Sequence, residues 1–90
     1  MNSVIINGKM TDCVASSDRG LLYGDGLFET VAVIKGEPCF WQLHLQRLQA
    51  GCSRLGIEAV DEVLLTEECR QLVDGVDRAV VKIIVTRGSG

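Results

Sequence analysis

Apolar residues recur at a helical period through the middle of this 90-residue chain. Successive spacings of four, three, four and three residues place them on one side of an α-helix. We expect the helix to end at Gly56, because glycine readily takes the left-handed conformation that closes a helix. A helix with one apolar side must cover another apolar surface. The residues that form this side are Trp41, Leu45, Leu48, Cys52 and Leu55.

Two hairpins are expected before this helix. Asn7-Gly8 is a strong signal for a two-residue turn, and residues 35–38 carry the glycine and proline of a second turn. The segment after Gly26 is rich in β-branched side chains, which favour strands. The expected arms are residues 4–6 and 10–13 for the first hairpin, and residues 28–34 and 39–41 for the second.

A second helix and a last strand complete the expected order of elements. The helix begins near Asp61 or Thr66, either of which can act as its N-cap, and ends around Asp74-Gly75. Residues 79–86 are apolar on both faces except for Lys82, as expected of an interior strand. The order predicts an α+β fold, an antiparallel sheet of hairpins with two helices packed on one face. We expect this second helix to bury Leu65, Cys69, Leu72 and Val73.

Composition excludes several classes of function. The net charge is −3 with both signs interspersed, which argues against nucleic-acid binding, and no basic run suggests a membrane surface. The N-terminus lacks the zones of a signal peptide, and no apolar run is long enough to cross a bilayer. The four cysteines include no Cys-x-x-Cys pair and there is one histidine, so no zinc spacing is present. We expect reduced, buried thiols in a cytoplasmic protein.

Gly24-Asp25-Gly26 predicts a sharp bend before the strand at residues 28–34. A bend there presents Phe28, Glu29 and Thr30 at the start of the strand, where side chains often face a cleft. Taken alone, however, such a tripeptide is more often a plain turn.

Three cations are candidates for an anion site. Arg47 lies off the apolar side of the first helix, one turn from His44 and from Gly51, and could hold a phosphate or simply be solvated. Lys82 could form a Schiff base, meet a substrate carboxylate, or pair with an acidic residue at a sheet edge. Arg87 could hold an anion or cap a turn. The residues by themselves predict a possible anion site and no particular reaction.

Four motifs occur in one order along nearly the whole chain. They are Ile6-Asn7-Gly8, residues 17–30 from Ser17-Asp18-Arg19-Gly20 through Gly-Asp-Gly-Leu-Phe-Glu-Thr, His44-Leu45-Gln46-Arg47-Leu48, and Val85-Thr86-Arg87-Gly88-Ser89-Gly90. In these motifs the chain resembles the N-terminal domain of the branched-chain-aminotransferase-like (fold type IV) enzymes, which use pyridoxal 5′-phosphate. Within that family it looks most like the aminodeoxychorismate lyases, which release 4-aminobenzoate and pyruvate in folate biosynthesis.

The resemblance implies roles for six residues. Arg47 would bind the cofactor phosphate, and Phe28 would line the substrate pocket with Glu29 and Thr30 near it. Lys82 and Arg87 are candidates for holding a dicarboxylate substrate. D-amino acid aminotransferases use a tyrosine hydroxyl where Phe28 stands, which favours the lyase branch.

The resemblance also implies what these residues do not supply. The family's Schiff-base lysine lies in a second domain, so residues 1–90 would be the small N-terminal domain, with no catalytic residue and no activity alone. The full-length protein would be a homodimer. Two alternatives stay open: a branched-chain or D-amino acid aminotransferase of the same fold, and a non-catalytic assembly domain.

Overall fold

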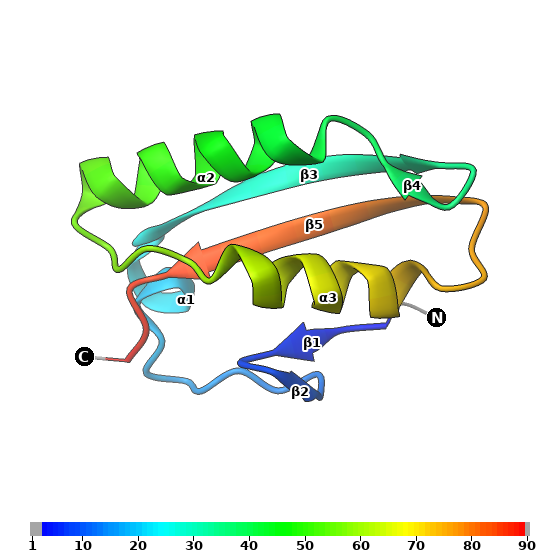
Figure 1. The fold of residues 1–90 in the computed structure, drawn as a ribbon. Coiled ribbons are helices and arrows are strands. Elements are labelled where there is room, and N and C mark those ends of the chain that lie inside the picture. The colour runs from blue at the N-terminus through cyan, green and yellow to red at the C-terminus, as the bar shows by residue number, and fades with distance from the viewer. Residues whose placement is uncertain (1–2, 90) are drawn as a thin grey trace.

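A three-stranded antiparallel sheet in the order β4-β3-β5 is the centre of the computed structural model (Figure 1), which describes residues 3–89. The long strands β3 (Gly26–Ile34) and β5 (Arg78–Thr86) pair along their whole length, with Thr30 opposite Lys82. The short strand β4 (Glu37–Pro38) pairs with the far end of β3. The expected α+β fold is confirmed.

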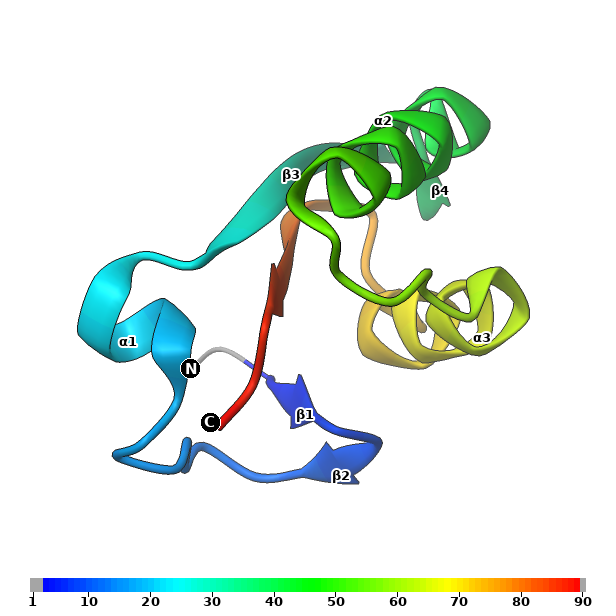
Figure 2. The same ribbon diagram turned by 90° about the vertical axis from the view of Figure 1, so that its left-hand side faces the viewer.

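Both long helices cover one face of this sheet, as Figure 2 shows. Helix α2 (Trp41–Leu55) ends at Gly56 in the left-handed conformation, as predicted. Helix α3 (Glu62–Val73) begins after Asp61, whose side chain accepts a hydrogen bond from the Leu64 N–H. The two helices are joined where the Trp41 indole donates to the Thr66 hydroxyl at 2.9 Å.

The core lies between this face and the helices. Leu45, Leu48 and Cys52 of the predicted apolar side are buried in α2, and Val31 and Ile83 meet them from the sheet. The opposite face of β3 and β5 carries no helix along its length in the described part of the chain (Figure 2). Apolar side chains are exposed there, among them Val80 and Ile84.

Two expectations about the strands need correction. The second hairpin turns at Lys35-Gly36, both with positive φ. Its return arm is therefore Glu37–Pro38 (β4), directly after the turn, and not the expected residues 39–41. Phe40 then takes φ 56° and directs the chain into α2, and Trp41 therefore belongs to the helix. The last strand is not interior among residues 3–89, because β5 pairs there with β3 alone.

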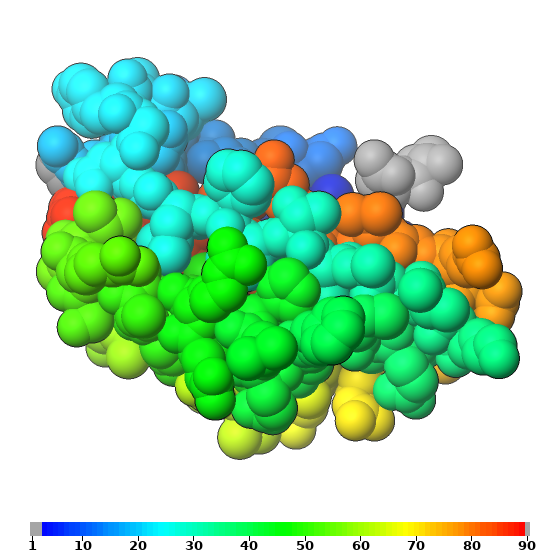
Figure 3. Space-filling view, turned by 90° about the horizontal axis from the view of Figure 1, so that it is seen from above, coloured from blue at the N-terminus to red at the C-terminus, as the bar shows by residue number. Residues whose placement is uncertain are grey.

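The N-terminal segment forms two small elements. Asn7-Gly8 makes the predicted turn between β1 (Ile5–Ile6) and β2 (Lys9–Met10), with arms shorter than expected. Helix α1 (Arg19–Tyr23) is a single short turn, capped by the Asp18 carboxylate at its start and by Gly24 at its end. In Figure 3 α1, in cyan, projects from one end of the molecule.

Candidate functional site

Two of the motifs, far apart in the sequence, lie side by side at this end of the sheet. The Arg19 N–H donates to the Gly88 carbonyl at 2.8 Å, and Asp18 forms an isolated β-bridge with Ser89. The Thr86 hydroxyl donates to Asp18 Oδ2 at 2.9 Å. The second and the last of the four motifs therefore build one surface. Gly90 lies outside the described residues.

The predicted bend at Gly24-Asp25-Gly26 is present in the structure and is closely packed. A Cβ on Gly26 would collide with the Val85 carbonyl oxygen across the sheet, so this position admits only glycine without a backbone shift. Asp25 Oδ2 accepts hydrogen bonds from Arg19 Nε at 3.0 Å and Arg87 Nε at 2.8 Å. The hydrogen bond from Arg87, then that from Arg19, lowers the pKa of the Asp25 carboxyl below its usual 3.8.

Arg87 is held on the helix side of this bend. Besides Asp25, its guanidinium donates to the main-chain carbonyls of Leu55 at 2.5 Å and Gly56 at 3.3 Å. These contacts tie the end of β5 to the end of α2. Arg87 therefore caps the C-terminal end of α2. The structure does not bring it together with Phe28, Thr30 and Lys82.

Phe28, Thr30 and Lys82 do lie together on the uncovered face of the sheet. Thr30 pairs with Lys82 in register, and the Lys82 ammonium sits 4.4 Å from the centre of the Phe28 ring. Phe28 is 58% exposed although it is a large aromatic residue. An exposed ring with a cation above it is a surface that can receive an anionic ring compound.

An apolar hollow adjoins these residues. It measures about 510 Å³ and lies between α1 and the end of the sheet. Phe28 and Ile84 form its floor from the sheet, and Leu21 and Val14 border it from the N-terminal segment. Its size is in the range of small-molecule sites, and its few polar groups include Asp18 and Thr86.

Glu29 faces away from this hollow, toward α2. Successive strand residues point to opposite faces, so Glu29 lies on the face opposite Phe28 and Thr30. It is 8% exposed. Its Oε1 lies 2.7 Å from His44 Nδ1 and its Oε2 lies 3.7 Å from Arg47 Nε. The structure thus groups Glu29 with Arg47, an association that alternation along the strand could have indicated.

Arg47 is paired with Glu29 at one side of its guanidinium and is otherwise exposed to solvent. Its Nε side is paired with Glu29, yet its side chain is 73% exposed. Gly51, one turn away, does not form part of an open cradle, because a Cβ there would meet the end of the Leu27 side chain. Because Gly51 has no side chain, α2 can approach β3 closely. Of Arg47 and Gly51, only Arg47 is therefore available to bind an anion.

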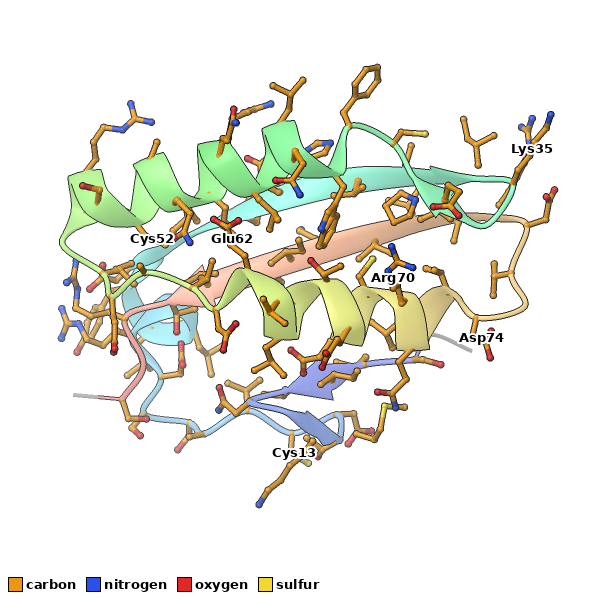
Figure 4. All side chains as sticks on the ribbon, in the orientation of Figure 1. Cys13, Lys35, Cys52, Glu62, Arg70 and Asp74 are labelled. Carbon is orange, nitrogen blue, oxygen red and sulfur yellow. The ribbon has the colours of Figure 1, made fainter. Side chains whose placement is uncertain are left out.

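A second hollow, of about 370 Å³, lies at the other end of the sheet beyond the β3–β4 turn. Its charged lining includes Lys35, Arg70 and Asp74, which Figure 4 shows at the turn, on α3 and directly after α3. All three side chains are exposed. No group of three or more potential metal ligands occurs among residues 3–89, and no helix there is long and apolar enough to span a membrane.

Comparison with known families decides the assignment of this chain. Residues 26–90 match the family described as "Amino-transferase class IV". This chain belongs to the class IV aminotransferase family. The match begins at the second glycine of the bend and contains Arg47 and Lys82.

Curated relatives of this class IV domain carry different activities. It is 32% identical to aminodeoxychorismate lyase from Vibrio harveyi, over 94% of this chain and 31% of that protein. It is 35% identical to a protein assigned as a branched-chain-amino-acid aminotransferase from Methanocaldococcus jannaschii, over 97% of the chain and 33% of that protein. A D-alanine aminotransferase from Staphylococcus aureus is 29% identical, over 98% of the chain and 34% of that protein. The class IV domain thus spans about a third of each relative.

Solved structures agree with the fold. The crystal structure of 4-amino-4-deoxychorismate lyase from Pseudomonas aeruginosa superposes with a TM-score of 0.81 at 44% identity, covering 93% of this chain and 31% of that one. A hypothetical aminotransferase from Mycobacterium tuberculosis, in its pyridoxal-phosphate-bound form, has a TM-score of 0.84 at 23% identity, covering 92% of this chain and 32% of that one. The second similarity supports the fold alone.

Proposed function

We propose that this class IV domain forms part of a pyridoxal-phosphate-dependent 4-amino-4-deoxychorismate lyase, which converts its substrate to 4-aminobenzoate and pyruvate. The observation that carries the proposal is the grouping of Phe28, Thr30 and Lys82 beside an apolar hollow. The substrate is a six-membered ring with two carboxylates, which fits an aromatic wall beside a cation. The 44% identity to the Pseudomonas aeruginosa lyase supports the same reaction.

Arg47 fits the role of an anchor for the cofactor phosphate. Its guanidinium is exposed while Glu29 restrains the Nε side, so the terminal N–H groups are free to form two parallel hydrogen bonds with a phosphate. When bound, pyridoxal phosphate supplies an electron sink for breaking bonds next to the substrate amino group. This domain would contribute a fixed anchor for that group and no proton-transfer residue.

The residues of the uncovered face would bind and orient the substrate. Phe28 offers a flat apolar surface for the substrate ring. The Lys82 ammonium, 4.4 Å from the centre of the Phe28 ring, offers a positive charge for a substrate carboxylate. Thr30 is paired in register with Lys82, and its hydroxyl would be a further hydrogen-bond partner for the substrate. Apolar residues of the hollow would exclude water from the ring.

Several parts of the proposal concern the whole protein. The resemblance implies that a second domain supplies the Schiff-base lysine, so that residues 1–90 act as the small N-terminal domain. It also implies a homodimer, and we propose a cytoplasmic location with no nucleic-acid or membrane partner. A small-molecule substrate would be the principal ligand.

An aminotransferase of the same fold is the second candidate. It is favoured by the 35% identity to the Methanocaldococcus jannaschii protein and by the D-alanine aminotransferases among the relatives. The resemblance argues against a D-amino acid substrate, since Phe28 has no hydroxyl for the substrate carboxylate.

Assays of the full-length protein separate the two candidates. Purified protein with pyridoxal phosphate is incubated with 4-amino-4-deoxychorismate, and 4-aminobenzoate is measured by its fluorescence. Parallel reactions contain branched-chain or D-amino acids with 2-oxoglutarate. We expect 4-aminobenzoate release at a rate well above transamination. Transamination without 4-aminobenzoate would instead assign the aminotransferase, and neither activity would favour the assembly domain.

A further inference from the structure

Glu29 is the one buried charged or polar residue in the part of the chain that the structure describes. A carboxylate removed from water is costly unless it is paired and hydrogen-bonded. Here each carboxylate oxygen faces a different residue of α2: Oε1 contacts His44 Nδ1 at 2.7 Å and Oε2 faces Arg47 Nε at 3.7 Å. The burial of Glu29 is therefore compensated by these two residues.

Glu29 of β3 faces both His44 and Arg47 of α2, so that a strand residue contacts the arginine. His44 and Arg47 are three positions apart on α2, which places them on the same side of the helix. Glu29 lies in the middle of β3, paired in register with Ile83 of β5, and so belongs to the most regular part of the sheet. His44 occupies one carboxylate oxygen, which leaves the other directed at Arg47.

A free arginine side chain has many rotamers, and ordering it on binding costs free energy. Glu29 engages the Nε side of Arg47, while the guanidinium end stays exposed. This ion pair of 3.7 Å, which is longer than a hydrogen bond, favours rotamers that keep the Nε side toward Glu29 and the outer side toward solvent. Such an arrangement prepares the guanidinium for a phosphate before the ligand arrives.

We propose that Glu29 is a positioning residue, which orients Arg47 for a phosphate group and does not touch the substrate. The inference rests on the proposed role of Arg47 as the phosphate anchor. It assigns Glu29 a function on the helix-covered face of the sheet, in place of the substrate contact that the resemblance implied.

Two variants of the full-length protein test this role. Glu29→Gln keeps the shape and removes the charge, and Glu29→Asp keeps the charge but withdraws it by one methylene. Apoprotein is titrated with pyridoxal phosphate and, separately, with pyridoxal, which lacks the phosphate. We expect each variant to weaken pyridoxal phosphate binding about tenfold while pyridoxal affinity stays within about twofold.

The comparison of the two ligands separates positioning from a general structural effect. Equal weakening of both ligands would show that Glu29 only supports the fold. Unchanged or tighter pyridoxal phosphate binding by both variants would overturn the inference, because the carboxylate would then be neutral or a competing anion. If Glu29→Gln does not fold, Glu29→Asp still decides the question. Glu67→Gln on the exposed side of α3 is the matched control and should bind both ligands as the wild type does.

An Arg47→Ala variant distinguishes failure of the inference from failure of the proposed function. Arg47→Ala should weaken pyridoxal phosphate binding selectively, and Glu29→Gln added to it should cause no further selective loss. If Arg47→Ala leaves the affinity unchanged, the proposed phosphate anchor is wrong. If Arg47→Ala weakens binding and both Glu29 variants do not, only the positioning role is wrong.

Discussion

Asp25 and Arg87 are joined by an ion pair of 2.8 Å between Oδ2 and Nε. Asp25 lies in the bend before β3, and Arg87 follows β5. The same Arg87 guanidinium reaches the carbonyls at the end of α2, so one pair connects the bend, a strand and a helix. This arrangement keeps the end of the sheet, where the apolar hollow lies, in a defined shape.

Asp25→Asn should lower the midpoint of thermal unfolding at neutral pH by several degrees. The folded state lowers the pKa of Asp25 below 3.8, chiefly through the hydrogen bond from Arg87. A lowered pKa stabilises the fold above the unfolded-state value, and this stabilisation is lost as the pH falls through the folded-state value. The difference between wild type and variant should therefore shrink below about pH 3.8. Circular dichroism melts across this range measure it.

Asp74→Asn is the control for this experiment. Asp74 is exposed at the end of α3 and accepts no hydrogen bond from an arginine among residues 3–89. It should change the melting midpoint little at any pH. A difference between Asp25→Asn and wild type that persists unchanged in acid would contradict the charge-based account.

Two glycine substitutions should differ in effect although both add one methyl group. Gly26→Ala places its Cβ against the Val85 carbonyl, a main-chain atom that cannot move without disturbing β5, and should cost about 1–3 kcal/mol. Gly51→Ala meets the end of the Leu27 side chain, which can rotate, and gains helix propensity, so it should stay within about 1 kcal/mol of wild type. Urea unfolding compares them, and equal losses would contradict this explanation.

Three of the four cysteines, Cys13, Cys52 and Cys69, should react with a thiol reagent in a defined order. The expectation of buried thiols is confirmed for Cys52 and Cys69 and is wrong for Cys13, which is exposed. Burial raises the pKa of both buried thiols. Figure 4 shows Cys13 on the outside of the molecule and Cys52 on α2. Labelling near pH 8 followed by peptide mass spectrometry should find Cys13 modified first and Cys52 and Cys69 only in denaturant. Cys13→Ser should remove the fast label, and early labelling of Cys52 would contradict the packing.

Helix boundaries were predictable because their signals are local. The apolar period and Gly56 delimit α2, Asp61 caps α3, and Asn7-Gly8 turns the first hairpin. The end of the second hairpin was not predictable, because Phe40 adopts a positive φ that few residues other than glycine favour. Trp41 therefore leaves the strand in spite of a suitable sequence, although the Cys39 N–H still donates to the Ala32 carbonyl of β3.

The site was predictable only in part, because its contacts are not local. The resemblance grouped Phe28, Glu29 and Thr30 as neighbours in sequence, but alternation along β3 sends Glu29 to the other face. Likewise, no pattern in the sequence indicates that Arg87 bonds to carbonyls more than thirty residues earlier. Arg47, Phe28, Thr30 and Lys82 keep their predicted roles as proposals, each in a position that suits its role.

Under the proposed lyase function, Lys82→Met should impair substrate binding in the full-length protein and spare cofactor binding. The Lys82 ammonium lies over Phe28 on the uncovered face of the sheet, whereas Arg47 belongs to α2 and its side chain is exposed to solvent. Methionine keeps the length of the side chain and removes the charge that would meet a carboxylate. We expect KM for 4-amino-4-deoxychorismate to rise about tenfold, with pyridoxal phosphate affinity unchanged. Steady-state kinetics and cofactor titration measure the two effects.

Arg78→Met provides a matched loss of positive charge for this test. Arg78 begins β5 and lies on the same face four residues before Lys82, which is about 13 Å along an extended strand. At that distance an exposed charge is largely screened at physiological salt, so KM should stay near the wild-type value. Equal increases in KM for both variants would show that Lys82 acts only through the general field of the domain. An increase confined to Lys82→Met would support a direct contact with a substrate carboxylate.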